Sequence, residues 1–464
     1  MLFIKELKKI CLSIIYILFV GLLLFSWHEN FYGVTSKEIQ ASNGTNASIT
    51  SQITGGSILA KPEKGTDNYG SIKKEVPDKI MCGGTDMLII EYLKNSYSTY
   101  PFGYYKEVIL STQEQKEILS IIEEITGLSE EQIKNLPEDY FPSVNGNIIH
   151  MGDDVSQNQD GTFSFQTGDS DTSQDEKDYT KHFIAQVSYE RFKDLMTEAE
   201  KIIGAGSNYS MDMLQEYYGQ AEMTYDEAMN EYHKTIYVDK VSTAFARLFC
   251  DYMTRTLGLY PIFIVAIFWL KDRRNKMNEM IDSKKIKTVK LIIVRTLAIL
   301  TAVILPVVIL SLESLIPLME YSADTGIAID VFAFIKYILW WLLPTVMVVT
   351  GLGTFLSILT STPIAILVQS VWWFIDSAIT GLSGDTRLYT LMIRHNTLNG
   401  AELIQQDFNI ICLNRGIMII LSFILIYLSI VIYNKKRGGK LDYGYFMQRH
   451  FGIFKNRLLV RFQK

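Results

Sequence analysis

Few residues of this chain are spaced as catalytic or metal-binding groups usually are. No phosphate loop of the form G-x-x-x-x-G-K-[ST] occurs, so we expect the chain not to hydrolyse ATP by that route. The metalloprotease pattern H-E-x-x-H and the nucleophile pattern G-x-S-x-G do not occur either. The histidines are too scattered to argue for a metal site: His28, His150, His182, His233, His395 and His450. We therefore predict that the chain is not an enzyme and binds no metal or cofactor of its own.

Two ionisable residues lie in or beside apolar stretches, where charge is costly and therefore a sign of function. Lys336 lies near one end of the apolar stretch 331–350, and Asp376 directly follows the stretch 355–375. Both could extend out of lipid as interface anchors, or they could pair with each other. The alternative is that they form an outer gate. The nearby triad Arg394-His395-Asn396 is expected to cap helix ends, with contact to a transported substrate as the alternative.

The densest group of charges between two apolar stretches is KDRRNKMNEMIDSKKIKTVK, residues 271–290. This segment is too polar to enter lipid, and its lysines and arginines place it on the cytoplasmic side by the positive-inside rule. Met277, Met280 and Ile281 stand at i, i+3 and i+4, so they share one face if the segment is helical. Buried apolar groups usually dominate binding energy, which makes this face a candidate docking surface for a partner protein.

At these residues the chain resembles the permease subunits of type-2 ABC exporters. In that family the second helix ends in a cluster of acidic residues and arginine, a short cytoplasmic helix docks on a separate ATPase, and a Lys or Arg opens the third helix. The positions that match are Asp272, Arg273, Arg274, the helix 277–281, Lys290 and Arg295. The Ser-Pro-type signature that often precedes the third helix is replaced by Ser283-Lys284-Lys285, which departs from the pattern.

The resemblance implies a division of labour between subunits. A separate ABC ATPase would bind ATP and Mg²⁺, and a second permease subunit, identical or different, would complete the translocation path. Membrane lipid is the other expected partner, and nucleic acid is not. The residues expected to couple the chain to the ATPase are Asp272, Arg273, Arg274, Met277, Met280 and Ile281.

Apolar stretches of roughly 20 residues are long enough to cross a bilayer. Six candidates alternate with charged loops: residues 10–27, 252–270, 291–312, 331–350, 355–375 and 416–433. The expected fold class is an all-α polytopic membrane protein with six transmembrane helices and a large α-rich (α+β) extracytoplasmic domain between helices 1 and 2. Basic residues at both termini place the termini on the inner, cytoplasmic side of the cytoplasmic membrane. Residues 28–251 are then expected on the outer side.

The chain is 48% hydrophobic, but this share is unevenly distributed. The expected domains are residues 1–27, with a cytoplasmic lead-in and the first helix, and 28–251, the extracytoplasmic domain, in which 28–80 form a flexible tether because they are too polar to bury a core. Residues 252–434 hold helices 2 to 6 with the loop 271–290, and 435–464 form a basic cytoplasmic tail.

Within the outer domain, apolar spacing predicts helices over residues 112–127 and 189–203 and a short strand over 182–187. Residues 224–251 show the longest helical pattern, which meets no breaker before residue 257 and is expected to enter the membrane nearly continuously.

Three further features concern connections. Gly351-Leu352-Gly353 is expected to form a tight inner turn between two spans. Residues 382–412 either form re-entrant helices, as the resemblance implies, or lie on the outer surface. The tail interleaves aromatic and basic side chains, as is typical of a segment on anionic lipid.

Cys82 and Cys250 would both face the oxidising side and could pair, although two separate buried thiols are the simpler interpretation. Residues 154–161 resemble a calcium loop but lack the bidentate Glu at position twelve, so a solvated loop is favoured.

The function expected is that of an exporter permease, which moves a lipid, peptide or drug with a separate ATPase. The alternative is a polytopic membrane anchor that presents an outer recognition or sensor domain without transport. The loop 271–290 separates the two hypotheses, because an anchor has no need of a docking helix.

Overall fold

The structure is a computed structural model that describes residues 2–42, 58–65, 69–101, 105–136, 140, 155–157, 163–165, 183–275, 277, 280–281, 286–377, 387–394, 398 and 400–438. The chain is mostly helical and divides into two compact units. One unit comprises residues 1–69 and 224–464, which we call the helical block, and the other comprises residues 70–223, which we call the inserted unit.

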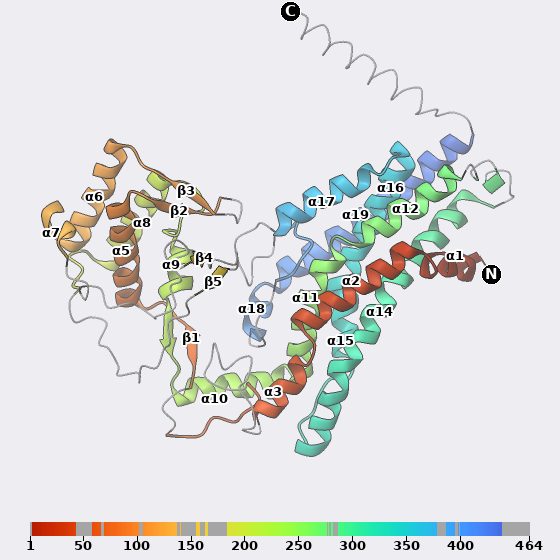
Figure 1. The fold of residues 1–464 in the computed structure, drawn as a ribbon. Helices are drawn as coiled ribbons and strands as arrows, with labels where there is room; N and C mark the ends of the chain where they lie inside the picture. The colour runs from red at the N-terminus through yellow and green to blue at the C-terminus, as the bar shows by residue number, and fades with distance from the viewer. Residues whose placement is uncertain are drawn as a thin grey trace, which may run out of the picture. The chain divides into compact units, whose positions relative to one another are not determined.

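The inserted unit packs its helices around a core of its own, and the strands among its described residues form three two-stranded antiparallel pairs (Figure 1). Its helices are α5 (Pro77–Lys94), α6 (Thr112–Thr126), α7 (Glu130–Lys134), α8 (Tyr189–Ile203) and α9 (Met211–Tyr218). Its strands are β1 (Ser71–Lys73), β2 (Tyr97–Thr99), β3 (Lys106–Val108), β4 (Val155–Gln157), β5 (Phe163–Phe165) and β6 (Gln220–Glu222). β1 pairs with β6, so the first and last elements of the unit lie together.

The helix-capping residues and apolar spacing of this unit produce the helices predicted from them. The predicted helices over 112–127 and 189–203 are confirmed as α6 and α8. The Ser111 hydroxyl accepts the backbone N–H of Glu114, whose carboxylate accepts the N–H of Ser111, and Gly127 ends the helix at φ 70°. The strand predicted over 182–187 is wrong for the described residues 183–187, which are irregular. There the Gln186 N–H donates to the Ile125 carbonyl rather than to a neighbouring strand.

The helical block contains the long apolar helices. In chain order its elements are α1 (Leu2–Cys11), α2 (Ile14–Asn30), α3 (Val34–Ser42), α10 (Tyr225–His233), the π-helical turn η1 (Lys234–Val238), α11 (Ser242–Leu257), α12 (Pro261–Arg274), α14 (Thr288–Thr325), α15 (Ala333–Tyr337), the π-helical turn η2 (Ile338–Leu342), α16 (Leu343–Thr360), α17 (Ile364–Ser377), α18 (Ala401–Gln406) and α19 (Phe408–Arg437). Figure 1 shows α2, α11, α12, α14, α16, α17 and α19 gathered into one bundle.

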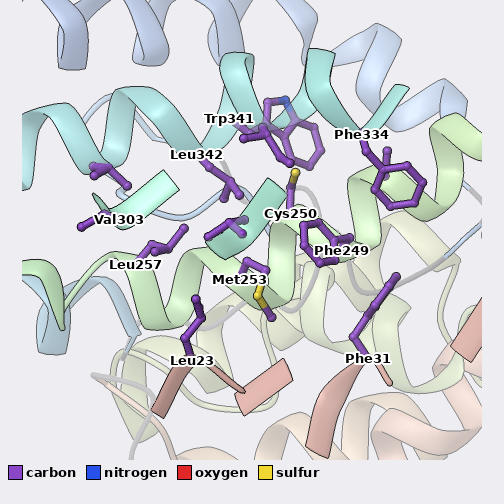
Figure 2. Packing of buried hydrophobic residues seen from close by; sticks show 14 of the residues in the cluster. Leu23, Phe31, Phe249, Cys250, Met253, Leu257, Val303, Phe334, Trp341 and Leu342 are labelled. Carbon is purple, nitrogen blue, oxygen red and sulfur yellow. The ribbon is translucent and has the colours of Figure 1, made fainter. Parts of the chain in front are cut away.

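A continuous hydrophobic core runs through this bundle (Figure 2). Leu23 of α2 faces Met253 and Leu257 of α11, which is buried on almost every side. Phe249 of α11 packs edge-on against Phe31 and Phe334, with ring centroids 5.3 and 5.8 Å away. α11 is therefore the central helix of the cluster.

Within the residues that the structure describes, four helical segments are long and apolar enough to cross a membrane: Ile14–Ser42, Thr288–Thr325, Ala333–Thr360 and Phe408–Arg437. A fifth arises if α11 and α12, which meet at a bend of 40°, form one broken span. The remaining predicted span, 355–375, is divided by a turn at Ser361 to Pro363. The 14 residues of α17 extend about 21 Å, less than the roughly 30 Å of a hydrocarbon core.

The unbroken helix expected over 224–251 and on into the membrane is not observed. Lys240 and Val241, at φ 48° and 50°, separate η1 from α11. A second break separates α11 from α12, because Pro261 has no N–H to continue the hydrogen-bond pattern. Residues 224–251 belong to the helical block by their contacts, whereas the sequence assigned them to the outer domain.

The turn predicted at Gly351-Leu352-Gly353 is also wrong, because α16 continues through these residues to Thr360. A Cβ on Gly351 would lie 3.2 Å from the Ser422 carbonyl of α19, and one on Gly353 would lie 2.7 Å from Ile262 of α12. The two glycines therefore let three helices approach closely, as small residues do between membrane helices.

The described parts of the two terminal segments also differ in part from expectation. Ser13 accepts the N–H of Tyr16 and separates α1 from α2, so the predicted first span 10–27 begins inside α1. α3 lies within the segment 28–80 that was expected to be a tether. Of the basic tail 435–464, the structure describes residues 435–438, of which 435–437 are the last turn of α19.

Candidate functional site

The segment 271–290 begins where α12 ends, and Asp272 in the last turn of α12 is held by Arg295 of α14. Arg295 Nη2 lies 2.5 Å from Asp272 Oδ2. Arg295 Nε lies 3.6 Å from Glu6 Oε2 in α1. A single arginine thus ties together three helices, and two of them flank the segment 271–290.

The centre of this cluster, Arg295 with Glu6, is buried. Arg295 and Glu6 are each 3% exposed, and the guanidinium lies 5.4 Å from the ring of Phe268 and 5.0 Å from that of Trp269. A buried charge is tolerated when it is paired, and aromatic faces add to the stabilisation of a cation. Lys9 completes the balance, because its ammonium lies 3.1 Å from Glu6 Oε1. The cluster therefore holds two cations and two anions.

The end of α12 is also fixed against α16 and α19. The Trp269 indole N–H donates to Thr354 Oγ1 of α16 over 3.1 Å. The same ring lies 6.4 Å, centroid to centroid, from Tyr433 of α19. Because these contacts surround the last two turns of α12, a movement of that helix end would have to displace α14 and α16 with it.

The far end of the segment 271–290 is held by the last turn of α19. Arg437 Nη1 donates to the Ile286 carbonyl over 2.7 Å, just before α14 begins. Lys436 Nζ donates to the Leu359 carbonyl and to Ser361 Oγ, both over 3.1 Å, and so caps the end of α16. The segment is therefore framed by ordered contacts at both of its ends.

Between these ends, the structure describes part of the predicted docking face. Met277 is 40% exposed and Met280 57% exposed, while Ile281 is half-buried. The Ile281 N–H donates to the Met277 carbonyl over 3.0 Å, the i to i+4 bond of a helical turn. Arg273 and Arg274 belong to α12, but their side chains lie outside the described residues. The turn therefore presents two methionines outward.

The two residues predicted for an outer gate, Lys336 and Asp376, bind different partners. Lys336 forms an ion pair with Asp330, six residues earlier in the chain. Asp376, at the end of α17, is 2% exposed, and its Oδ2 accepts the backbone N–H groups of Leu391 and Met392 over 3.2 and 3.1 Å. Within the described residues, these two side chains therefore do not pair with each other.

The segment that Asp376 holds is irregular and buried. Residues 391–393 are buried although they are not helical. Arg394 Nη2 donates to the Asp376 and Ser377 carbonyls over 2.8 and 3.1 Å, which caps α17 as predicted for the triad; His395 and Asn396 lie outside the described residues. Irregular backbone within a membrane must be satisfied by protein groups, and here side chains bind the N–H groups of Leu391 and Met392 and the Leu391 carbonyl.

Arg415 of α19 is the main satisfying group, and sequence reasoning missed it because the predicted span began one residue later. It is 2% exposed and donates to the carbonyls of Trp341 (2.8 Å) and Thr390 (3.1 Å) and to Thr345 Oγ1 (2.8 Å). An arginine at the edge of an apolar run is a signal that could have identified it.

A second missed group is the pair Arg247 and Asp239. The Arg247 guanidinium, 1% exposed, binds the Asp239 carboxylate with both terminal nitrogens, in the geometry typical of a strong pair. The pair crosses the break between η1 and α11. It stabilises the irregular backbone at Lys240 and Val241.

Cys82 and Cys250 are both buried thiols, and neither forms a disulfide. Among the described residues, no three His, Cys, Asp or Glu side chains gather as metal ligands would. Most of the predicted solvated loop 154–161 lies outside the described residues.

Comparison with known proteins found no match: no family model, no curated protein and no solved structure matches this chain.

Proposed function

We propose that this chain is the permease subunit of a type-2 ABC exporter, which moves a lipid, peptide or drug across the cytoplasmic membrane together with a separate ATPase and a second permease subunit. The observation that carries the proposal is the segment 271–290, which presents exposed methionines while its two ends are tied into the bundle by Arg295 and Arg437. A loop of this kind suits the transfer of force from an external motor to two helices.

The proposed topology has six crossings, formed by α2, the bent pair α11 and α12, α14, α16, α17 and α19. In this arrangement α17 is short, and the buried segment 391–393 fills the remaining depth from the outer side as a re-entrant element. Lysines and arginines gather in α1, at the end of α12 and at the end of α19, which supports a cytoplasmic position for these ends by the positive-inside rule. Residues 70–223 would then lie outside.

In the proposed mechanism, ATP and Mg²⁺ bind to the partner ATPase and not to this chain. Met277, Met280 and Ile281 would dock on the ATPase, with Arg273 and Arg274 as electrostatic guides. Movement of the docked turn would pull on Asp272. Because Asp272 is bound to Arg295, the pull would reach α12 and α14 together.

The experiment compares two double variants of the full chain, purified from native membranes. Met280→Asp with Ile281→Asp places charge on the proposed docking face. Ile316→Asp with Met319→Asp makes the same kind of change at exposed positions of α14 beyond the predicted span 291–312. We expect the first variant to lose a co-purifying ATPase and its ATP hydrolysis, and the second to retain both. Retention of the ATPase with normal hydrolysis in the first variant would contradict docking.

The alternative function, a membrane anchor that presents a recognition or sensor domain, is favoured by one observation. Residues 70–223 have a hydrophobic core of their own, as a separately folded recognition domain would. Wild-type chain that purifies from native membranes without an ATPase and without ATP hydrolysis would support this alternative over the transporter.

A further inference from the structure

Helix α17 is too short to cross a membrane by itself, and it carries polar side chains that bind backbone groups of another helix. We propose that Gln369 and Trp373 of α17 are positioning residues that hold the break between α11 and α12 and thereby set the direction of α12. The consequence for transport rests on the proposed function, but the positioning itself does not.

The carbonyls of Arg255 and Gly258 are among the backbone groups that the break leaves without their usual helical donors. In a continuous helix the N–H groups of Leu259 and Ile262 would donate to the carbonyls of Arg255 and Gly258. Here they donate instead to the carbonyls of Thr256 and Leu259, over 3.3 and 3.2 Å. Pro261 begins α12 and has no N–H to offer. The carbonyls of Arg255 and Gly258 therefore need donors from outside the helix.

Helix α17 supplies both donors. Trp373 Nε1 donates to the Arg255 carbonyl over 2.9 Å, and Gln369 Nε2 donates to the Gly258 carbonyl over 2.6 Å. Residues 369 and 373 are one helical turn apart, so they lie on one face of α17. Gln369 is fully buried, where a carbonyl that lost its donor could not turn to water instead.

Gly258 lets α17 come close enough for these bonds. A Cβ at position 258 would lie 3.2 Å from Cδ1 of the Trp373 ring and 3.1 Å from the Thr254 carbonyl. Both distances are tighter than an ordinary van der Waals contact. The glycine, the proline three residues later and the two donors on α17 therefore form one unit, which we call the α12 latch.

The latch lies at one end of α12, and Asp272 lies near the other. Since α12 has 14 residues, it is about 21 Å long, and a change of about 20° in its direction would move its far end by about 7 Å. The latch therefore acts together with the contacts of Arg295 and Trp269 to set where Asp272 and the docking turn lie. In the proposed transporter, it would determine how movement of the docked turn is shared between α12 and the rest of the bundle.

The test measures the position of the far end of α12 directly. Spin labels are placed on cysteines at Lys271, an exposed residue near the end of α12, and at Tyr427, a 64% exposed residue of α19, in full chain that lacks its native cysteines. The distance distribution is then compared between the unaltered latch and the variant Gln369→Leu with Trp373→Phe. We expect the variant distribution to shift or broaden by several ångströms.

The matched control is Trp372→Phe, which makes the same chemical change on the neighbouring residue. Trp372 Nε1 donates to the Tyr389 carbonyl and not to the break. The control should leave the distance unchanged. An unchanged distance in the double variant would overturn the proposal. If the double variant does not fold, Trp373→Phe alone is measured, and an unchanged distance there overturns it equally.

The same samples separate this proposal from the proposed function. The latch variant keeps Met280 and Ile281, so we expect it to retain the ATPase while the distance changes. If the wild type binds no ATPase, the transporter proposal fails, and the distance measurement still decides whether Gln369 and Trp373 position α12.

Discussion

The helical block buries its charges as pairs or against backbone groups, whereas the inserted unit buries carboxylates among neutral donors. In the helical block, Arg295 is bound by two carboxylates, and Arg247 binds Asp239. In the inserted unit, Glu91 of α5 accepts the Tyr209 hydroxyl over 2.5 Å and the Ser98 N–H over 2.9 Å. The ion pairs of the helical block hold separate helices together. The Glu91 hydrogen bonds lie within the single core of the inserted unit.

This difference changes how each unit responds to charge and pH. A paired buried ion is costly to break, because the partner is left as an uncompensated charge. A buried carboxylate with neutral partners instead shifts its pKa upward, and burial raises the pKa of Asp86 to about 6 and that of Glu91 above its usual range. Loss of one partner from the paired charges of the helical block should therefore be severe, whereas the carboxylates buried in the inserted unit should make its stability respond to pH.

The largest effect is expected from Arg295→Leu, which leaves Glu6 and Asp272 without their shared cation. Loss of one partner from a buried pair costs about 3–5 kcal/mol. We expect a large fall in the thermal midpoint of the full chain in detergent. The control Lys290→Leu removes an exposed cation from the same helix and should change little. Equal midpoints for the two variants would show that the cluster does not stabilise the bundle.

A smaller, pH-dependent effect is expected at Asp86. Its pKa is raised by burial, so folding favours the protonated form. Its contribution to stability is full below the ordinary aspartate pKa of 3.8 and is lost as pH rises through about 6. Asp86→Asn should stabilise the inserted unit at pH 7, by on the order of 2 kcal/mol, and by much less at pH 4.

Hydrogen exchange of α5 in the full chain measures this change at both pH values. Asp78→Asn, at an exposed position in the first turn of the same helix, is the control and should show no such pH dependence. A gain for Asp86→Asn that is the same at pH 4 and pH 7 would refute the assignment of the raised pKa.

The smallest effect is expected from the capping box of α6. Ser111→Ala removes the hydroxyl that accepts the Glu114 N–H and should destabilise the inserted unit by about 1 kcal/mol. Ser120→Ala removes an exposed hydroxyl that donates to the Glu117 carbonyl within the same helix, and it should be neutral within about 0.5 kcal/mol. Hydrogen exchange of α6 distinguishes them, and equal protection would refute a stabilising cap.

Much of the inserted unit could be predicted from its sequence because its signals are local. Ser111, Gly127 and the isoleucine stripe of α6 act over one or two turns, so the sequence alone determined where that helix begins, ends and buries its face. For the helical block, the sequence determined that long apolar helices exist and that the segment 271–290 is polar between them. The methionines of that segment were recognised for the same reason, since their spacing is a local property.

Tertiary structure decided where those apolar helices break and which polar side chains meet. Gly351 and Gly353 suggested a turn, but the close approach of α12 and α19 explains them as packing positions. The breaks at Val241 and Gly258 are stabilised by Arg247 with Asp239, and by Gln369 with Trp373, the latter two more than 100 residues distant in the chain. Because a free carbonyl in an apolar bundle can be satisfied by a donor from any neighbouring helix, local periodicity carries no information about which donor it finds.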